Sequence, residues 1–455
     1  MKVSDIVTAT GGRLLSGDPA AGVDASKIST DSRGIKKGSL FIALNGPNFD
    51  GNDFAREALR RGACGAIVLR GRGKPIAAGR KVVIEVGDTT KALQDIARFH
   101  RMKFDIPVIA VTGSNGKTTT KEMIWEVLSR RYKVLKNEGT KNNHIGVPQT
   151  LLKLTARHEM CVLELGTNHA GEIRALAGIA RPTMAVITNV GHSHLEFLRD
   201  LVGVFREKRS LVTSLGRWSK IVLNGDDPFL ARIKDSRYVT ILCGFKKSND
   251  YAAGGVSARG ERLRFDVNGA KGFELRLLGR HNIYNALAAV AVGAQFGVSY
   301  GAARKALKSY APANRRLNLV EVGGLSVIDD CYNSNPLSMK SALEALAAYP
   351  ARMRWVVSAD MLELGRKSAH LHRAIGADIA RSPASGMITF GTLSRHTLAE
   401  ARARGMQKDR SWHCLTHDGV AAILKRVAKK GDAVLIKGSR AMRMEEVIKK
   451  LGVGS

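Results

Sequence analysis

The chain has 455 residues, of which 44% are hydrophobic and 5% aromatic, and this length suits a globular enzyme of about two to four domains. No apolar run reaches bilayer-spanning length, and the N-terminal stretch MKVSDIVTATGG lacks the apolar core of a secretory signal. The net charge of +32 is spread along the sequence instead of lying in a tail, which argues against a nucleic-acid-binding protein. The five cysteines form no CxxC pair, so we expect free thiols in a reducing cytoplasm.

The first hundred residues alternate short strands with helices. Strands are predicted at residues 39–44, 65–69 and 81–86, and helices at residues 53–63 and 91–104. The second helix leads into the next apolar strand, so we place a boundary after residue 102. The sequence thus predicts a small mixed α/β domain over residues 1–102.

The most informative stretch is VIAVTGSNGKTTTKEM, residues 108–123. A buried strand over residues 105–112 precedes a glycine-containing loop that exposes backbone N–H groups at a helix N-terminus, which favours a bound phosphate. Lys117 can reach the terminal phosphates, and the Thr118 hydroxyl can bind Mg²⁺. Val111 stands where the commonest phosphate loop has a glycine, and a turn that binds nothing is the alternative. We predict an ATP site formed by Gly113, Ser114, Asn115, Gly116, Lys117, Thr118 and Thr119.

The central region continues as strand, loop and helix. Strands are predicted at residues 161–166, 184–190 and 220–227, and they end in the polar residues Glu164, Thr188, Asn189 and Asn224. Ligands gather at the carboxyl ends of parallel strands, so we expect these side chains to face the nucleotide. A β-rich insert over residues 244–278 and a long alanine-rich helix over residues 277–297 complete a central ATPase domain, residues 103–313.

A third unit begins near residue 314. Strands are predicted at residues 324–330, 352–360, 386–391 and 432–438, separated by helical segments. This alternation predicts a Rossmann-like C-terminal domain over residues 314–455. The fold class is therefore α/β with three domains: a small mixed one, a parallel-sheet ATPase domain and a Rossmann-like one.

Six motifs occur in one order along the chain: GSNGKTTT, ELGTNHAGEI, TNVGHSHLEFL, LNGDDP, GRHNIYNALAA and NRRL. Together they resemble the Mur ligase family, the ATP-dependent amide-forming ligases of peptidoglycan synthesis. The resemblance implies three domains that bind a UDP-sugar, ATP and an amino substrate. It also implies ATP and Mg²⁺ as cofactors, cell-wall biogenesis as the process and the cytoplasm as the location.

Four further segments indicate which reaction of the family to expect. KNEGTKNNHIGVPQTLL, IDDCYNSNPLSM, DMLELG and KGSRAMRME resemble the member that adds D-alanyl-D-alanine. The resemblance implies that an acyl phosphate forms on the C-terminal carboxylate of UDP-N-acetylmuramoyl-tripeptide and that D-alanyl-D-alanine then displaces phosphate. The alternatives are another amino-acid ligase of this family and, remotely, a nucleic-acid-binding ATPase. We expect a monomer that neither binds nucleic acid nor inserts into a membrane.

The resemblance also implies the metal ligands and the catalytic residues. The expected Mg²⁺ ligands are Thr118, Glu164, His194 and Lys208 as a carbamate, and the expected catalytic residues are Lys117, Lys208, His194 and Arg316. His192 is left as a surface or supporting histidine. Arg206 and Arg209 flank Lys208, so an ordinary solvated basic run is the alternative there.

The remaining expected contacts involve nucleotide and substrates. Asn282 and Asn285 resemble the adenine-contacting positions, with helix capping by Asn282 as the alternative. Asp330, or else Asp329, resembles the aspartate that acts with Arg316 on ribose and phosphate. We expect Ser29, Asp31, Ser32 and Arg33 to bind the UDP group, and Asn142 and Asn143 to contact the sugar or its muramoyl arm. Asn333 and Asn335 are expected to shape the dipeptide pocket. Asn52 replaces a histidine that is usual in the UDP-binding segment, which leaves a contact from that side chain in doubt.

Overall fold

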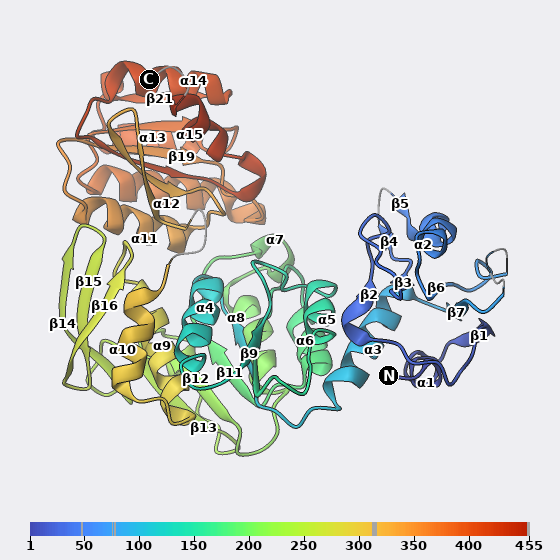
Figure 1. Cartoon of the computed structure of the whole chain (residues 1–455). Coiled ribbons are helices and arrows are strands. Elements are labelled where there is room, and N and C mark those ends of the chain that lie inside the picture. Colours follow the sequence, from blue (N-terminus) through green and yellow to red (C-terminus); the bar gives the residue numbers. More distant parts are fainter. Residues whose placement is uncertain (47–48, 75, 77–78, 312–315, 453–455) are drawn as a thin grey trace.

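The computed structural model describes the chain except residues 47–48, 75, 77–78, 312–315 and 453–455, and Figure 1 shows three parts that follow one another in sequence. The parts are built around a five-stranded, a nine-stranded and a six-stranded sheet. This arrangement confirms the predicted three-domain α/β fold class. Within the described residues, no helix is long and apolar enough to cross a membrane.

The N-terminal sheet has the strand order β1-β7-β6-β3-β2, with only β1 antiparallel to its neighbour. The elements of this part are α1 (Val3–Thr10), β1 (Arg13–Ser16), β2 (Ile28–Ser29), β3 (Leu40–Ile42), β4 (Asn45–Gly46), β5 (Phe49–Asp50), α2 (Ala55–Arg60), β6 (Gly65–Leu69), β7 (Val82–Val86) and α3 (Thr89–Arg101). Strands β4 and β5 pair with each other in a separate two-stranded sheet. Helix α3 ends at Arg101 and not at residue 104, because the Arg101 guanidinium donates to the carbonyls of Phe104, Ile106 and Ala180. This contact ties the first part to the second.

The central sheet has the order β16-β15-β14-β13-β12-β11-β8-β10-β9, parallel from β9 to β14 and antiparallel in the insert. Its elements are β8 (Val108–Thr112), α4 (Lys117–Leu128), β9 (Val134–Lys136), α5 (Gly146–Leu151), β10 (Met160–Glu164), α6 (Glu172–Ala180), β11 (Met184–Ile187), α7 (Leu195–Leu198), α8 (Leu201–Val212), β12 (Lys220–Asn224), β13 (Val239–Gly244), β14 (Tyr251–Arg259), β15 (Arg262–Val267), β16 (Ala270–Arg276), α9 (Asn282–Gln295) and α10 (Tyr300–Ser309). All five residues of β8 and of β10 are buried, as expected for strands covered on both faces.

Two predicted elements are too long at their start. The strand predicted from residue 105 begins at Val108, directly after Pro107, which cannot donate a ladder hydrogen bond. The helix predicted from residue 277 begins at Asn282, because Gly279 lies in the left-handed region at φ +87° and interrupts the chain direction.

The C-terminal sheet has the order β17-β18-β22-β19-β20-β21, and only β17 is antiparallel to its neighbour. Its elements are β17 (Asn318–Val322), β18 (Leu325–Asp330), α11 (Pro336–Ala348), β19 (Arg354–Ala359), α12 (Ser368–Arg381), β20 (Gly386–Phe390), α13 (Arg395–Ala403), β21 (Ser411–Cys414), α14 (His417–Val427), β22 (Ala433–Lys437) and α15 (Glu445–Gly452). The boundary predicted between residues 313 and 314 lies outside the described residues. The ranges 1–102, 103–313 and 314–455 therefore stay predictions.

Candidate active site

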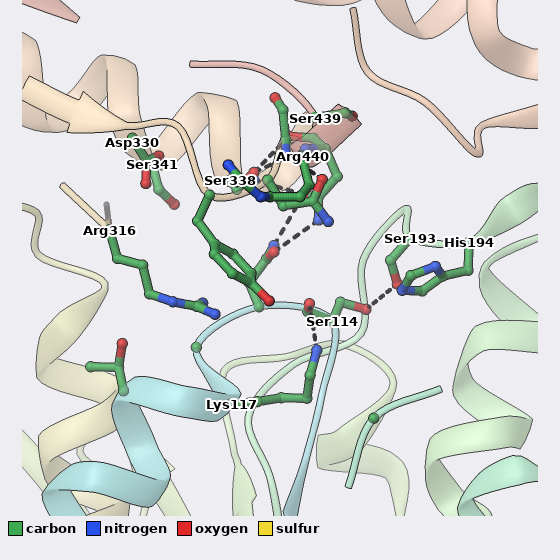
Figure 2. A pocket seen from close by; sticks show the side chains of 18 of the residues that line it. Ser114, Lys117, Ser193, His194, Arg316, Asp330, Ser338, Ser341, Ser439 and Arg440 are labelled. Atoms are coloured by element: carbon green, nitrogen blue, oxygen red, sulfur yellow. Dashed lines mark hydrogen bonds between the residues drawn. The ribbon is translucent and has the colours of Figure 1, made fainter. Parts of the chain in front are cut away.

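A cavity of about 570 Å³ lies between the central and third domains and is lined by both. Its walls come from the carboxyl ends of β8 and β10 on one side and of β18 and β22 on the other, which is where open parallel sheets bind ligands. Figure 2 shows Ser114, Lys117, Ser193 and His194 on the central-domain side, facing Asp330, Ser338, Ser439 and Arg440 of the third domain. The predicted residues that line it are Ser114, Asn115, Gly116, Lys117, Thr119, Asn142, Glu164, His194, Asn282, Asn285, Arg316, Asp330, Asn333 and Asn335.

The phosphate loop requires both of its glycines. Gly113 has φ +152° and Gly116 φ +78°, and a Cβ at these positions would lie 1.8 Å from Thr188 Oγ1 and 2.6 Å from Asn285 Oδ1. The loop is also fixed from the next strand, because the Asn115 N–H donates to Asn189 Oδ1 at 2.9 Å. Thr188 and Asn189 thus shape the loop. Of the other predicted strand-end residues, Asn224 lines a separate small cavity beneath it.

Lys117 lies at the first position of α4 and points back over the loop. Its Nζ donates to the carbonyls of Gly113 and Ser114 at 2.9 and 3.3 Å. Burial lowers the pKa of this lysine, while Glu164 acts in the opposite direction. A cation held among backbone dipoles at a helix N-terminus is well placed to receive phosphate oxygens.

Glu164 is the central acidic group of the site and is 1% exposed. Its two carboxylate oxygens accept hydrogen bonds from Thr118 Oγ1 and Asn142 Nδ2, both at 2.7 Å. The buried Asn137 holds the same strand end, because its Oδ1 accepts from the Glu164 N–H and its Nδ2 donates to the Glu164 carbonyl. The prediction that Thr118 and Glu164 lie together is therefore met.

This oxygen pair fits the needs of Mg²⁺, which commonly binds one or two protein oxygens together with substrate phosphates. Among the residues that the structure describes, no group of three His, Cys, Asp or Glu side chains could hold a metal. The predicted ligand set contains only two side chains of these four types, Glu164 and His194, so this finding leaves it untested.

His194 lies on the central-domain side of the cavity and contacts Glu363 of the third domain (Figure 2). Its Nδ1 is 2.6 Å from Glu363 Oε2, and the hydrogen bond from His194 lowers the pKa of Glu363. His194 has φ +52°, a left-handed conformation that a residue of this kind adopts only when its surroundings hold it. His192 is half-buried, and burial lowers its pKa.

Lys208 lies on α8 and is 1% exposed, so the alternative of a solvated basic run is wrong. Burial, together with the nearby charge of Lys117, lowers the pKa of Lys208 to about 7. At neutral pH a large share of this lysine is therefore an uncharged amine, which is the form that can take up carbon dioxide. Lys208 is not among the cavity-lining residues, and the carbamate stays a prediction.

Asn282 and Asn285 join helices α4 and α9. Asn282 does not cap α9, because His281 holds that position and Asn282 Nδ2 donates to the Leu278 carbonyl at 2.8 Å. Asn285 donates to Asn282 and accepts from Thr120 Oγ1. Burial lowers the pKa of His281 to about 4, and its Nδ1 lacks a hydrogen-bond partner among the described residues. A neutral imidazole therefore stands at the cavity beside the two asparagines.

The third domain contributes a buried ion pair and a stacked arginine. Lys437 Nζ lies 2.5 Å from Asp330 Oδ2 and also donates to the Asn333 carbonyl. The Arg316 guanidinium lies 4.1 Å from the centre of the Tyr332 ring. Asp330 lines the cavity, whereas Asp329 accepts from the Cys331 N–H, which favours Asp330 over Asp329 for the predicted ribose contact.

The phosphate loop touches the third domain through a pair of amides. Asn115 and Asn335 exchange two side-chain hydrogen bonds of 3.1 and 2.8 Å. Asn335 is also the N-cap of α11, where its side chain accepts from the Ser338 N–H. The dipeptide loop predicted from DDCYNSNP is thus in direct contact with the ATP loop.

The predicted UDP-binding residues lie apart from this cavity. Ser29, Asp31, Ser32 and Arg33 form a loop of the first domain in which Arg33 pairs with Asp31 at 2.9 Å. Gln149 of α5 donates to Thr30 at 2.8 Å, and Asn143 accepts from the first N–H groups of that helix. The loop therefore lies beside the asparagine segment. Asn52 is used inside the first domain, where its Oδ1 accepts from the Leu69 N–H.

Several residues of the site were not singled out from the sequence. They are Asn137, Asn168, Ser193, Tyr332, Glu363, Lys437, Ser439 and Arg440. Glu363, Lys437, Ser439 and Arg440 fall within DMLELG and KGSRAMRME, so these motifs contained a usable signal. Asn137 likewise falls within KNEGTKNNHIGVPQTLL, but nothing set it apart from its neighbours, because an asparagine in a loop usually makes a turn.

Three family models match the chain in order. The Mur ligase family catalytic domain matches residues 24–101, the Mur ligase middle domain matches residues 111–293, and the Mur ligase glutamate ligase domain matches residues 315–440. The UDP-N-acetylmuramoyl-tripeptide–D-alanyl-D-alanine ligase of Bacillus subtilis is 38% identical, covering 93% of this chain and 92% of its own length. The enzyme of the same name from Escherichia coli is 32% identical, with 96% of both chains covered.

Solved structures give the same relationship. Crystal structure I of MurF from Acinetobacter baumannii has a TM-score of 0.89 at 29% identity, covering 99% of this chain and 98% of that one. The MurF ligase of Thermotoga maritima, solved with ADP, has a TM-score of 0.83 at 28% identity, covering 94% and 98%. On its motifs, its three-domain architecture and these similarities, the chain belongs to the Mur ligase family.

Proposed function

We propose that this protein is an ATP-dependent ligase that joins D-alanyl-D-alanine to the C-terminal carboxylate of UDP-N-acetylmuramoyl-tripeptide. The observation that carries the proposal is the meeting of three loops at one cavity: the phosphate loop, the Asn142 segment and the Asn333–Asn335 segment. The names and high coverage of the Bacillus subtilis and Escherichia coli relatives support the same reaction.

The reaction has two steps. A carboxylate oxygen of the tripeptide attacks the γ-phosphorus of ATP, so that a P–O bond forms and ADP leaves. The amine of D-alanyl-D-alanine then attacks the acyl carbon, loses a proton, and expels inorganic phosphate as the amide forms. The first step develops charge on phosphoryl oxygens, which Lys117 and Arg316 can neutralise from opposite sides of the cavity.

Thr118 and Glu164, with His194 and carbamylated Lys208, would hold Mg²⁺. Bound Mg²⁺ supplies charge neutralisation for the phosphate oxygens and holds them in position. The protein supplies the positions of these ligands: Asn142 and Asn137 hold Glu164, and Glu363 holds His194. Asn282, Asn285 and Asp330 would contact the adenosine part of ATP.

The substrates are assigned to different domains. Ser29, Asp31, Ser32 and Arg33 would bind the UDP group, and Asn142 and Asn143 the sugar or muramoyl arm between that loop and the cavity. Asn333 and Asn335 would bind the dipeptide. Because the reaction consumes ATP, we place it in the cytoplasm, as a step of cell-wall precursor synthesis carried out by a monomer.

An acceptor panel tests the substrate assignment. With ATP and the UDP-linked tripeptide present, we expect ADP release with D-alanyl-D-alanine and at least about a hundredfold lower kcat/KM with D-alanine, D-glutamate or a diamino acid, since a site with polar groups aimed at a substrate rejects analogues that leave those groups unpaired. Equal turnover with any of these acceptors would refute the assignment and favour another ligase of the family.

The carbamate at Lys208 has its own test. Lys208→Ala should lose at least about a hundredfold in kcat, as expected when a positioned charged group is removed, and added acetate or formate should restore part of that loss. Arg209→Ala, which alters a neighbouring exposed residue, should lose little activity and should regain none with acetate. If acetate restores no activity to Lys208→Ala while the variant stays folded, the carbamate role is wrong.

A further inference from the structure

Six neighbouring strands of the central sheet, in the order β9, β10, β8, β11, β12 and β13, run parallel to one another. They all begin at one edge of the sheet, opposite the cavity. We call this edge the amino edge, and Figure 1 shows it on the lower side of the central domain, away from the third domain. It is formed by the segments that lead into these strands, residues 102–107, 129–133, 152–159, 181–183, 213–219 and 233–238.

The amino edge is strongly basic. Its segments contain ten lysines and arginines but three acidic residues, and all ten basic side chains are exposed. Asp235 is paired with Arg237 at 2.7 Å. Three further basic residues pair with carboxylates outside these segments: Lys103 with Asp5, Arg130 with Glu126 and Lys153 with Glu138. Part of the charge that looks evenly spread along the sequence is therefore gathered in space, because parallel strands bring distant segments to one edge.

An exposed tryptophan stands in the middle of this charge. Trp218 is 68% exposed, and Val239, which begins the neighbouring strand β13, is 43% exposed. Met102 is 58% exposed and lies on the same edge, in the segment that leads into β8, two strands away from β12. Trp218 has φ +65°, and its N–H donates to the Arg237 carbonyl at 2.6 Å. A large side chain in the left-handed region is strained and persists only when its surroundings hold it. The fold therefore keeps this ring in solvent, with the Arg217 guanidinium 5.8 Å from its centre.

We propose that the amino edge binds the surface of an anionic phospholipid bilayer. Basic side chains gain from a negative lipid surface, and a tryptophan among them has the apolar body and polar tip that the headgroup region favours. Met102, Trp218 and Val239 add apolar area that a purely electrostatic partner would leave unused. Binding of this kind is peripheral, and it leaves the cavity on the opposite side of the domain open to its substrates.

Vesicle sedimentation of the full-length protein tests the proposal. At low salt we expect binding to vesicles of equal phosphatidylglycerol and phosphatidylcholine but not to phosphatidylcholine alone. The double variant Arg217→Glu/Lys234→Glu should bind at least about 25-fold more weakly, since each basic residue near such a surface contributes about fivefold. Trp218→Ser should weaken binding and abolish the blue shift of tryptophan emission on vesicle addition.

Matched variants on the third domain serve as controls. Lys429→Glu/Lys430→Glu changes the same charge, and Leu415→Ser removes an equally exposed apolar side chain, at 67%; both should bind as the unmodified protein does. All four variants should keep full ligase activity. Binding that ignores lipid charge, or that survives the Arg217→Glu/Lys234→Glu change, overturns the proposal. A single-stranded RNA bound more tightly than the vesicles would instead make the edge a nucleic-acid surface.

Discussion

Lys117→Ala is expected to lower ligase turnover by at least about a thousandfold, because a preorganised cation at a developing phosphoryl charge contributes a factor of about 10²–10³ or more. The lysine is positioned for this role at the N-terminus of α4, within reach of the loop carbonyls that surround the phosphate site. The loss should appear in kcat for ADP release and for product formation alike.

The fold should survive this change. Burial lowers the pKa of Lys117, so keeping this lysine charged costs the folded protein free energy. Replacement by alanine should therefore change the unfolding temperature by no more than about 2 °C. Lys247→Ala, which alters an exposed lysine of the same domain, should keep normal turnover. Turnover near normal in Lys117→Ala would remove the lysine from the mechanism.

Glu164→Ala should cause a loss of similar size, about 10²–10³ in kcat, and should raise the Mg²⁺ concentration needed for half-maximal rate. The buried carboxylate meets both Thr118 and Asn142, so its removal would take away a proposed metal ligand and loosen the loop that holds Asn142. Magnesium titrations of the initial rate measure both effects.

Two further variants make the Glu164 result interpretable. Glu164→Gln keeps the volume and one acceptor oxygen but removes the charge, and it should lose activity without losing its fold. Glu159→Ala removes an exposed carboxylate at the opposite end of the same strand and should be nearly silent. If Glu164→Gln keeps normal turnover at the Mg²⁺ concentration that the unmodified protein needs, Mg²⁺ binding does not depend on the charge of this residue.

Most of the fold was predictable because it is built from buried, apolar strands. The predicted strands that became β8, β10, β11 and β12 are all present, as is the insert that became β14 to β16. The strands β1, β2, β4, β5, β9, β13, β17 and β21 were not predicted. Most of them are short, such as β9 with three residues and β21 with four, or lie at an edge of a sheet, as the partly exposed β17 does. Short edge strands leave a weak hydrophobic period, so pattern alone rarely finds them.

The site was predictable where one motif carries its chemistry within a few residues. Lys117 and Thr118 follow from the phosphate loop itself. The contacts between domains could not be predicted, because nothing local marks Asn115 as the partner of Asn335, 220 residues away, or His194 as the partner of Glu363. Burial was also hidden: Lys208 looks like part of a solvated basic run until α8 turns it inward.

The central claim is that a carboxylate of the UDP-linked tripeptide is activated by ATP and then captured by D-alanyl-D-alanine. Heavy oxygen placed in that carboxylate tests it directly, with mass spectrometry of the released phosphate and of the product. The account predicts one labelled oxygen in each phosphate released, one phosphate per amide formed, and a product heavier by the dipeptide less one water. Phosphate without label, or ADP release that continues over many turnovers without D-alanyl-D-alanine, would contradict it.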